Sequence, residues 1–158
     1  MAVDMFLKIG TIEGEAKDPD HRDWIDLSSV SHGLTQPSTV RSAGGGAEAP
    51  LVQDLSIAKE LDKSSPKLAE ACCHGAIIPD ATIEFVRTSA DGTAPERYFE
   101  IKMHDVLVSS YQTGGSSGDV VPVDSISLNF GKIEMVYTPY DRGIPQPSVR
   151  FVCEPGAD

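Results

Sequence analysis

Alternation of apolar and polar residues with a period of two is the feature that most constrains the fold of this chain. In the first long alternating stretch, Phe99, Ile101 and Met103 share one parity, whereas Val106 and Val108 lie on the other. Successive side chains of a β-strand point to opposite faces of the sheet. The pattern therefore predicts a long strand whose apolar face changes partway along its length.

A second long stretch has the same property. Its apolar residues change parity after Gly131, with one set before that residue and another after it: Ile126, Leu128, Phe130, then Ile133, Met135, Tyr137. An extra residue in a strand shifts the parity in this way, and glycine suits such a β-bulge, so we predict a bulge at Gly131. Because strands with repeated phase shifts bend around a core, we expect a mainly β fold. The expected architecture is a small β-barrel of two curved, mostly antiparallel sheets, with one short helix and long loops.

Shorter alternating patterns predict the remaining strands over residues 5–9, 24–34, 51–58, 82–87 and 149–153. One helix is predicted between Ser65 as its N-cap and Gly75 as its C-terminal stop, with Pro66 in the first turn. It is about nine residues long and too short to persist alone, so we expect it to pack on the sheet or on a neighbouring chain. Glycine-rich loops are expected over 38–50 and 113–122.

The charge of the chain excludes several classes of partner. Its 158 residues suit one domain, and 24 acidic against 13 basic residues give a net charge of −11. Phosphate backbones and anionic membrane surfaces would be repelled, so we expect neither nucleic-acid binding nor membrane insertion. Residues 1–8 lack the basic and apolar regions of a signal peptide. We therefore expect synthesis in the cytosol without a cleaved leader.

Residues that are able to carry chemistry do not form a recognisable catalytic or metal motif. The acidic segment with Asp18, Asp20, His21 and Asp26 fails as a calcium loop, because Asp23 stands where that loop needs glycine. Cys72, Cys73 and Cys153 contain no CxxC pair, and we expect all three thiols to be free. The sequence thus predicts no metal and no cofactor.

Two further patterns contain residue types that are found in enzyme motifs. His104, Asp105, Ser109 and Ser110 supply the residue types of a hydrolytic triad, but adjacent residues of a strand point to opposite faces, and a GxSxG elbow is absent from the sequence. The glycines at 44–46 are not followed by Lys and Ser or Thr, so they do not form a phosphate-binding loop. We predict that the protein is not an enzyme.

Several motifs in order resemble the Hcp family of type VI secretion. They are the opening MAVDMFLKI, then QDLS at 53–56 and LDKSSPKL at 61–68, then DVLVSSYQT at 105–113 and SISLNF at 125–130. The similarity covers residues 1–139, which we expect to form the family domain. Residues 140–158 form a divergent Pro- and Gly-rich tail and not a separate domain.

The resemblance implies a structural subunit of the secretion tube. Members of the family form six-membered rings that stack into a tube, carry effector proteins in the lumen and leave the cell. The implied partners are other copies of the chain, effectors, and the tube-tip and sheath proteins. Ser31 matches a lumen-facing position, and His32 stands where many members carry Trp. The loop residues implied to contact a neighbouring subunit or ring are Arg41, Ser42, Gly44, Gly45, Gly46 and Glu48.

Two alternatives stay open from the residues alone. One is a monomeric β-barrel that binds a ligand or a protein, although one Trp and four Tyr offer few aromatic platforms for sugars. The other is a hydrolase that uses His104. Solution mass separates the first alternative from a ring, and activity loss in His104→Ala would support the second.

Overall fold

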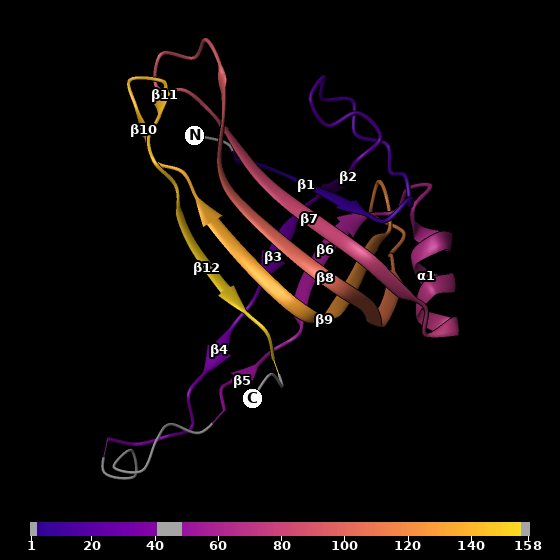
Figure 1. Cartoon of the computed structure of the whole chain (residues 1–158). Helices are drawn as coiled ribbons and strands as arrows, with labels where there is room; N and C mark the ends of the chain where they lie inside the picture. Colours follow the sequence, from indigo (N-terminus) through magenta and orange to yellow (C-terminus); the bar gives the residue numbers. More distant parts are fainter. Residues whose placement is uncertain (1–2, 41–48, 156–158) are drawn as a thin grey trace.

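The computed structural model describes residues 3–40 and 49–155, and it shows a nearly closed antiparallel barrel (Figure 1). One eight-stranded sheet has the order β2-β1-β7-β8-β9-β6-β3, with β12 paired to β9. Its strands are β1 (Val3–Ile9), β2 (Ile25–Leu27), β3 (Ser29–Ser31), β6 (Leu55–Glu60), β7 (Ile77–Thr88), β8 (Pro95–Gly114), β9 (Val123–Tyr137) and β12 (Val149–Cys153). The expected mainly β barrel with one short helix is confirmed.

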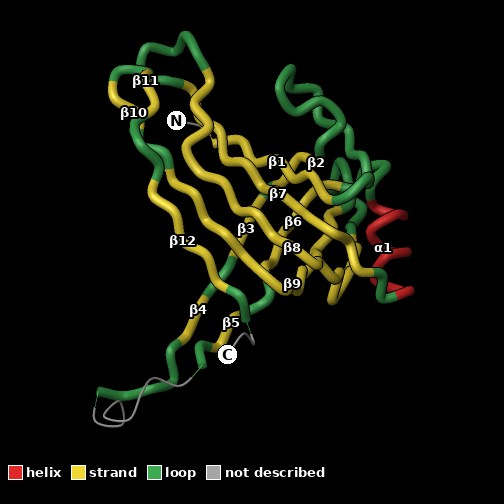
Figure 2. The backbone as a smooth tube through the Cα atoms, viewed as in Figure 1, coloured by secondary structure: helices red, strands yellow, loops and turns green. Residues whose placement is uncertain are grey.

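Two small two-stranded sheets accompany the barrel. They pair β4 (Leu34–Thr35) with β5 (Leu51–Val52), and β10 (Tyr140–Asp141) with β11 (Ile144–Pro145). Figures 1 and 2 show the β4–β5 hairpin projecting away from the barrel wall. The strand expected over 149–153 is confirmed as β12, which pairs with the second half of β9.

The strand that was expected over 24–34 is instead broken into β2, β3 and β4, and this break closes the barrel. β2 pairs with β1 at one end of the sheet, whereas β3 pairs with β6 at the other end. Ser28 lies between them and donates its backbone N–H to the carbonyl of Ala58 at 2.7 Å. A single short stretch of chain therefore joins the two ends of the sheet.

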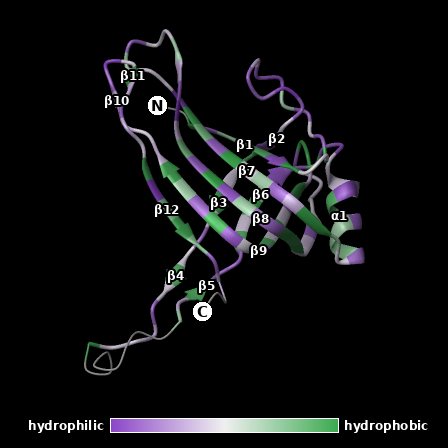
Figure 3. Cartoon of the chain, in the orientation of Figure 1, coloured by the Kyte–Doolittle hydropathy of each residue, from purple (hydrophilic) through white to green (hydrophobic). Residues whose placement is uncertain are grey.

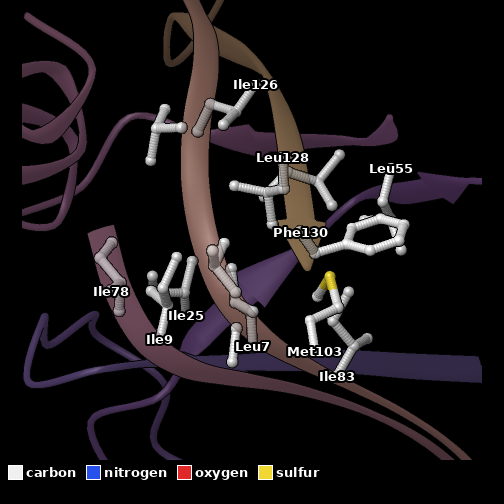
Figure 4. Packing of buried hydrophobic residues seen from close by; sticks show 14 of the residues in the cluster. Leu7, Ile9, Ile25, Leu55, Ile78, Ile83, Met103, Ile126, Leu128 and Phe130 are labelled. Atoms are coloured by element: carbon white, nitrogen blue, oxygen red, sulfur yellow. The ribbon is translucent and has the colours of Figure 1, made fainter. Parts of the chain in front are cut away.

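The core fills the barrel with the inward-facing residues of the long strands. Leu7, Ile25, Ile83, Met103 and Leu128 come from five strands and are completely buried (Figure 4). Burying a side chain of this size contributes roughly 1.5–3 kcal/mol. Green and purple bands along β7, β8 and β9 in Figure 3 show the alternation that was visible in the sequence.

The bulge predicted at Gly131 is wrong, although the change of parity is real. The pairs His104–Lys132 and Val106–Phe130 keep one register on both sides of Gly131. The backbone adjusts at Asp105, whose φ is 54°. In both strands the side chains that face the core therefore switch from one set of alternate residues to the other, and they do so at paired positions. No extra residue is needed in either strand. The register shifts lie elsewhere, between Val108 and Ser110 and between Phe85 and Val86.

The helix α1 (Ser65–His74) covers one end of the barrel. Its N-cap is Ser64 and not Ser65 as predicted, while Gly75 ends it in the left-handed conformation (φ 62°). Leu68 and Ala71 are buried on the barrel side. Within residues 3–40 and 49–155, no helix has the length and apolar character that a membrane span requires.

Candidate functional site

A patch of small uncharged side chains covers the outer face of four neighbouring strands, and we call it the serine face. Its first row runs in register from Ser31 on β3 to Ser56 on β6, Ser127 on β9 and Ser110 on β8. A second row follows two residues away, and its members are Ser29, Ala58, Ser125 and Gln112. Because side chains two apart on a strand share a face, these eight residues form one continuous surface.

The hydroxyl groups of the serine face are partly linked to one another. Ser127 Oγ lies 2.5 Å from Ser110 Oγ and 2.7 Å from Ser109 Oγ. Ser109 also donates to Asp54 Oδ2 at 2.6 Å, and Asn129 donates to Asp54 Oδ1 at 2.9 Å. The rows line a shallow groove of about 380 Å³. The groove therefore offers hydroxyl donors and acceptors but no formal charge from the two rows.

Two of these strands, β8 and β9, carry a different surface beyond Asp105 and Gly131, and we call it the charged face. It consists of outward side chains of β7, β8, β9 and β12 that pair with one another: Glu84, Arg97, Glu100, Lys102, Glu134 and Arg150. Arg97 contacts Glu84 at 3.3 Å and Glu100 at 2.9 Å, and Arg150 contacts Glu134 at 3.0 Å. The charges of this half are therefore largely neutralised within the chain.

A buried ionic network lies directly behind the serine face. Lys59 on β6 is fully buried, and its ammonium group contacts Asp62 and Asp124 at 2.9 Å each. It also donates to Ser65 Oγ at 2.9 Å, and Ser65 in turn donates to Asp124 Oδ2 at 2.5 Å. The network joins β6, β9 and the first residue of α1, so it fixes the helix to the barrel.

Hydrogen bonding sets the protonation of this network. Burial alone raises the pKa of Asp124, but hydrogen bonds from Ser65 and Lys59 outweigh it, so its pKa lies below the ordinary 3.8. Tyr111 donates to Asp124 Oδ1 at 3.1 Å. Burial, and then the charge of Asp124, raises the pKa of Tyr111 above its ordinary value. The network therefore holds an ionised carboxylate beside a neutral phenol.

Sequence reasoning missed the Lys59 network, although a signal was present. Lys59 continues the inward parity of Leu55 and Ile57, and Asp124 continues the parity of Ile126. A charged residue in the apolar phase of a strand is either buried with a partner or marks an end of the strand. Lys59 and Asp124 both stand in the inward phase of their strands and have opposite charges. This pattern predicts that they pair inside the barrel.

The residues predicted from the sequence fall into three groups. Ser31 is exposed and stands in the first row of the serine face. The predicted contact residues Arg41, Ser42, Gly44, Gly45, Gly46 and Glu48 lie outside the described residues. His32 points to the opposite side from Ser31, because its ring packs against buried Phe130 with 5.7 Å between ring centroids.

The acidic segment and the cysteines show no metal or redox site in the described residues. His21 is buried, with Nδ1 2.7 Å from Asp18 Oδ2 and Nε2 3.1 Å from Glu84 Oε2, and it stacks on Phe6. In the described part of the chain, no cluster of His, Cys, Asp and Glu is arranged to hold a metal ion. Cys72, Cys73 and Cys153 are free thiols, as predicted.

The hydrolase hypothesis gains no support from the geometry around His104. Ser109 is bonded to Asp54 and Ser127, and Ser110 is bonded to Ser127. Asp105 follows His104 on the strand with a left-handed backbone. Ser110 is therefore a member of the serine face, Ser109 is bonded to it through Ser127, and the two serines do not form a triad with His104.

The fold and the site define a small β-barrel protein with a hydroxyl-lined groove on its outer face. Residues 6–137 match the family model described as "Type VI secretion system effector, Hcp". Protein hcp1 of Pseudomonas aeruginosa is 41% identical over 140 residues, which cover 88% of this chain and 85% of the relative. This chain therefore belongs to the Hcp family of type VI secretion proteins.

Solved structures agree with this assignment. A structure described as a type six secretion system protein has a TM-score of 0.84 at 26% identity, covering 94% of this chain and 92% of that one. Hcp1 from Salmonella typhimurium has a TM-score of 0.78 at 26% identity, covering 98% and 95%. A type VI secretion system effector from Yersinia pestis has a TM-score of 0.76 at 27% identity, covering 96% and 99%. The barrel, the helix and the projecting hairpin are thus set in a fold shared with secretion proteins.

Proposed function

We propose that this chain is the structural subunit of a type VI secretion tube, in which six copies form a ring and rings stack around a lumen. The serine face lines that lumen and accommodates effector proteins. The observation that carries the proposal is the uncharged two-row lattice around Ser31, on a chain of net charge −11. A neutral hydroxyl surface contacts many cargo proteins without strong electrostatic trapping, which suits transport. The role is structural and needs no catalytic residue or cofactor.

The proposed partners follow from this role. Other copies of the chain close the ring by a heterologous contact, and such a contact gives a closed ring when its rotation divides a full turn. The loop with Arg41 and Glu48 contacts a neighbouring subunit or ring. Effectors occupy the lumen, and tube-tip and sheath proteins meet the assembled tube. The protein is made in the bacterial cytoplasm and delivered outside the cell or into a target cell.

Light scattering of the purified protein at moderate salt tests the assembly. A mass of about 101 kDa, six times 16.9 kDa, is expected for one ring. Since each copy carries a net charge of −11, screening by salt weakens repulsion between subunits. Rings are therefore expected to be more stable at moderate salt than at very low salt. A monomer at every concentration and salt would refute the ring.

The lumen position of Ser31 needs a separate test. Ser31→Glu places a charge in the first row, and we expect at least tenfold weaker retention of a co-expressed effector with an unchanged ring mass. Ser117→Glu is the matched control, because Ser117 is exposed in the loop before β9 and outside the serine face. Equal retention by both variants would contradict a lumen role for Ser31.

A further inference from the structure

His32 stands at the point where the chain leaves the barrel. It directly follows the barrel strand β3, and it precedes Gly33 and strand β4 of the projecting hairpin. The hairpin itself is short, with only the pairs Leu34–Val52 and Thr35–Leu51. A two-stranded hairpin of this size is marginal alone. Its attachment therefore depends on contacts at its root.

The root contacts centre on the His32 ring. The ring packs on Phe130, a residue that is 6% exposed and belongs to the barrel core. Beside it, Gln53 donates its backbone N–H to the Gly33 carbonyl at 3.1 Å and joins the two arms of the hairpin. His32 Nε2 is buried, and no partner for it exists among the described residues. A neutral imidazole tolerates this position because one ring nitrogen carries no proton.

An imidazolium does not fit the same position. Both nitrogens of the charged ring are donors, so Nε2 would become a buried N–H without an acceptor. We propose that His32 is an acid-sensitive latch, which holds the β4–β5 hairpin to the barrel at neutral pH and releases it in acid. Release moves the ring into water, where both N–H groups are satisfied.

The charges around the ring do not oppose this behaviour. The groups packed against it, the Phe130 ring on β9 and the Gln53 backbone, are uncharged. Asp54 follows Gln53, but its two carboxylate oxygens already accept from Ser109 and Asn129. Burial lowers the pKa of His32 below its ordinary 6.5, and a hydrogen bond with the Gln53 backbone opposes this only in part. Charged side chains are not among the causes of the shift.

Because the pKa of His32 is lowered, acid weakens the attachment of the hairpin. A histidine with a lowered pKa in the attached state binds fewer protons there than in the released state. The latch is therefore fully effective above pH 6.5 and weakens as the pH falls through the lowered pKa. Each pH unit by which attachment lowers the pKa of His32 corresponds to a tenfold change in the equilibrium between the attached and the released hairpin.

Amide hydrogen exchange at pH 7 and pH 5 tests the latch, with rates corrected for intrinsic exchange. The protection of residues 34–35 and 51–53 is expected to fall on acidification, while β7 stays protected. His32→Phe, which keeps a ring over Phe130 but cannot titrate, is expected to abolish the pH dependence. His74→Asn, at the exposed end of α1, is the matched control and is expected to behave like the natural chain. The samples are kept at a concentration where light scattering gives one mass at both pH values.

Two results would overturn the proposal. One is a hairpin whose protection is equal at both pH values, and the other is the same pH dependence in His32→Phe. If His32→Phe does not fold, the NMR titration of the His32 ring in the natural chain decides, because a midpoint at or above 6.5 refutes the latch. The readout is a property of one chain, so its failure leaves the ring proposal untouched.

Discussion

The outer surfaces of β8 and β9 differ completely on the two sides of Asp105 and Gly131. On one side, Ser110 and Ser127 belong to a neutral hydroxyl lattice, and on the other side Glu100 and Glu134 belong to a lattice of ion pairs. The strands, their pairing and the core behind them are continuous. The difference is therefore one of side-chain choice on a continuous backbone.

The two halves also differ in where they place their charges. On the charged face, Arg97 and Arg150 are more than half exposed and pair along the surface. Behind the serine face, Lys59 and Asp124 are completely buried and pair inside the barrel. The uncharged serine face thus lies over a buried ion pair. Three substitutions test this comparison, from the largest expected effect to the smallest.

Lys59→Met tests the buried pair. It leaves Asp124 ionised in the interior without its cation, and removing one partner of a buried pair costs about 3–5 kcal/mol. We expect that loss in the free energy of unfolding, measured with urea. A loss below 1 kcal/mol would show that the network behind the serine face contributes little to stability.

Asp105→Val tests the boundary between the two faces. Asp105 has a φ of 54°, and a β-branched residue is disfavoured there by about 1–2 kcal/mol. Urea unfolding is expected to show this loss, whereas Asp105→Gly should be neutral or stabilising. Lys102→Val on the same strand is the control, because Lys102 lies outside the left-handed region. If Asp105→Val and Lys102→Val had equal effects, the boundary would not be strained.

Arg150→Met tests the charged face. Its pair with Glu134 is on the surface, and such pairs contribute about 0.2–1 kcal/mol. We expect a small loss of stability that shrinks further at high salt, because surface charges are screened. An effect as large as that of Lys59→Met would abolish the distinction between surface and buried pairs.

Much of the barrel could be predicted from the sequence because burial follows a period of two. The alternation in β8 and β9, the parity change near Gly131, the short strand at 149–153 and the helix before Gly75 were all readable. The break of the expected strand at Ser28 was not, because local pattern does not show which partner each half takes. β2 pairs with β1 and β3 with β6, strands distant in sequence.

Part of the candidate site could also be predicted from the sequence, and part of it could not. The resemblance pointed to Ser31, but it could not give the register that aligns Ser31 with Ser56, Ser127 and Ser110. That register joins four strands that are spread over residues 29–137. The buried partners of Lys59 likewise depend on contacts between distant segments, and so does the burial of the His32 nitrogen that has no partner among the described residues.

By itself the sequence determined the class of fold, the family and the positions that face inward, because propensity, alternation and motif are local properties. Only the tertiary structure decided which polar residues share a surface and which charges are buried together. The physical reason is that strand register and barrel closure are set by the packing of the whole core, to which residues far apart in the chain contribute at once.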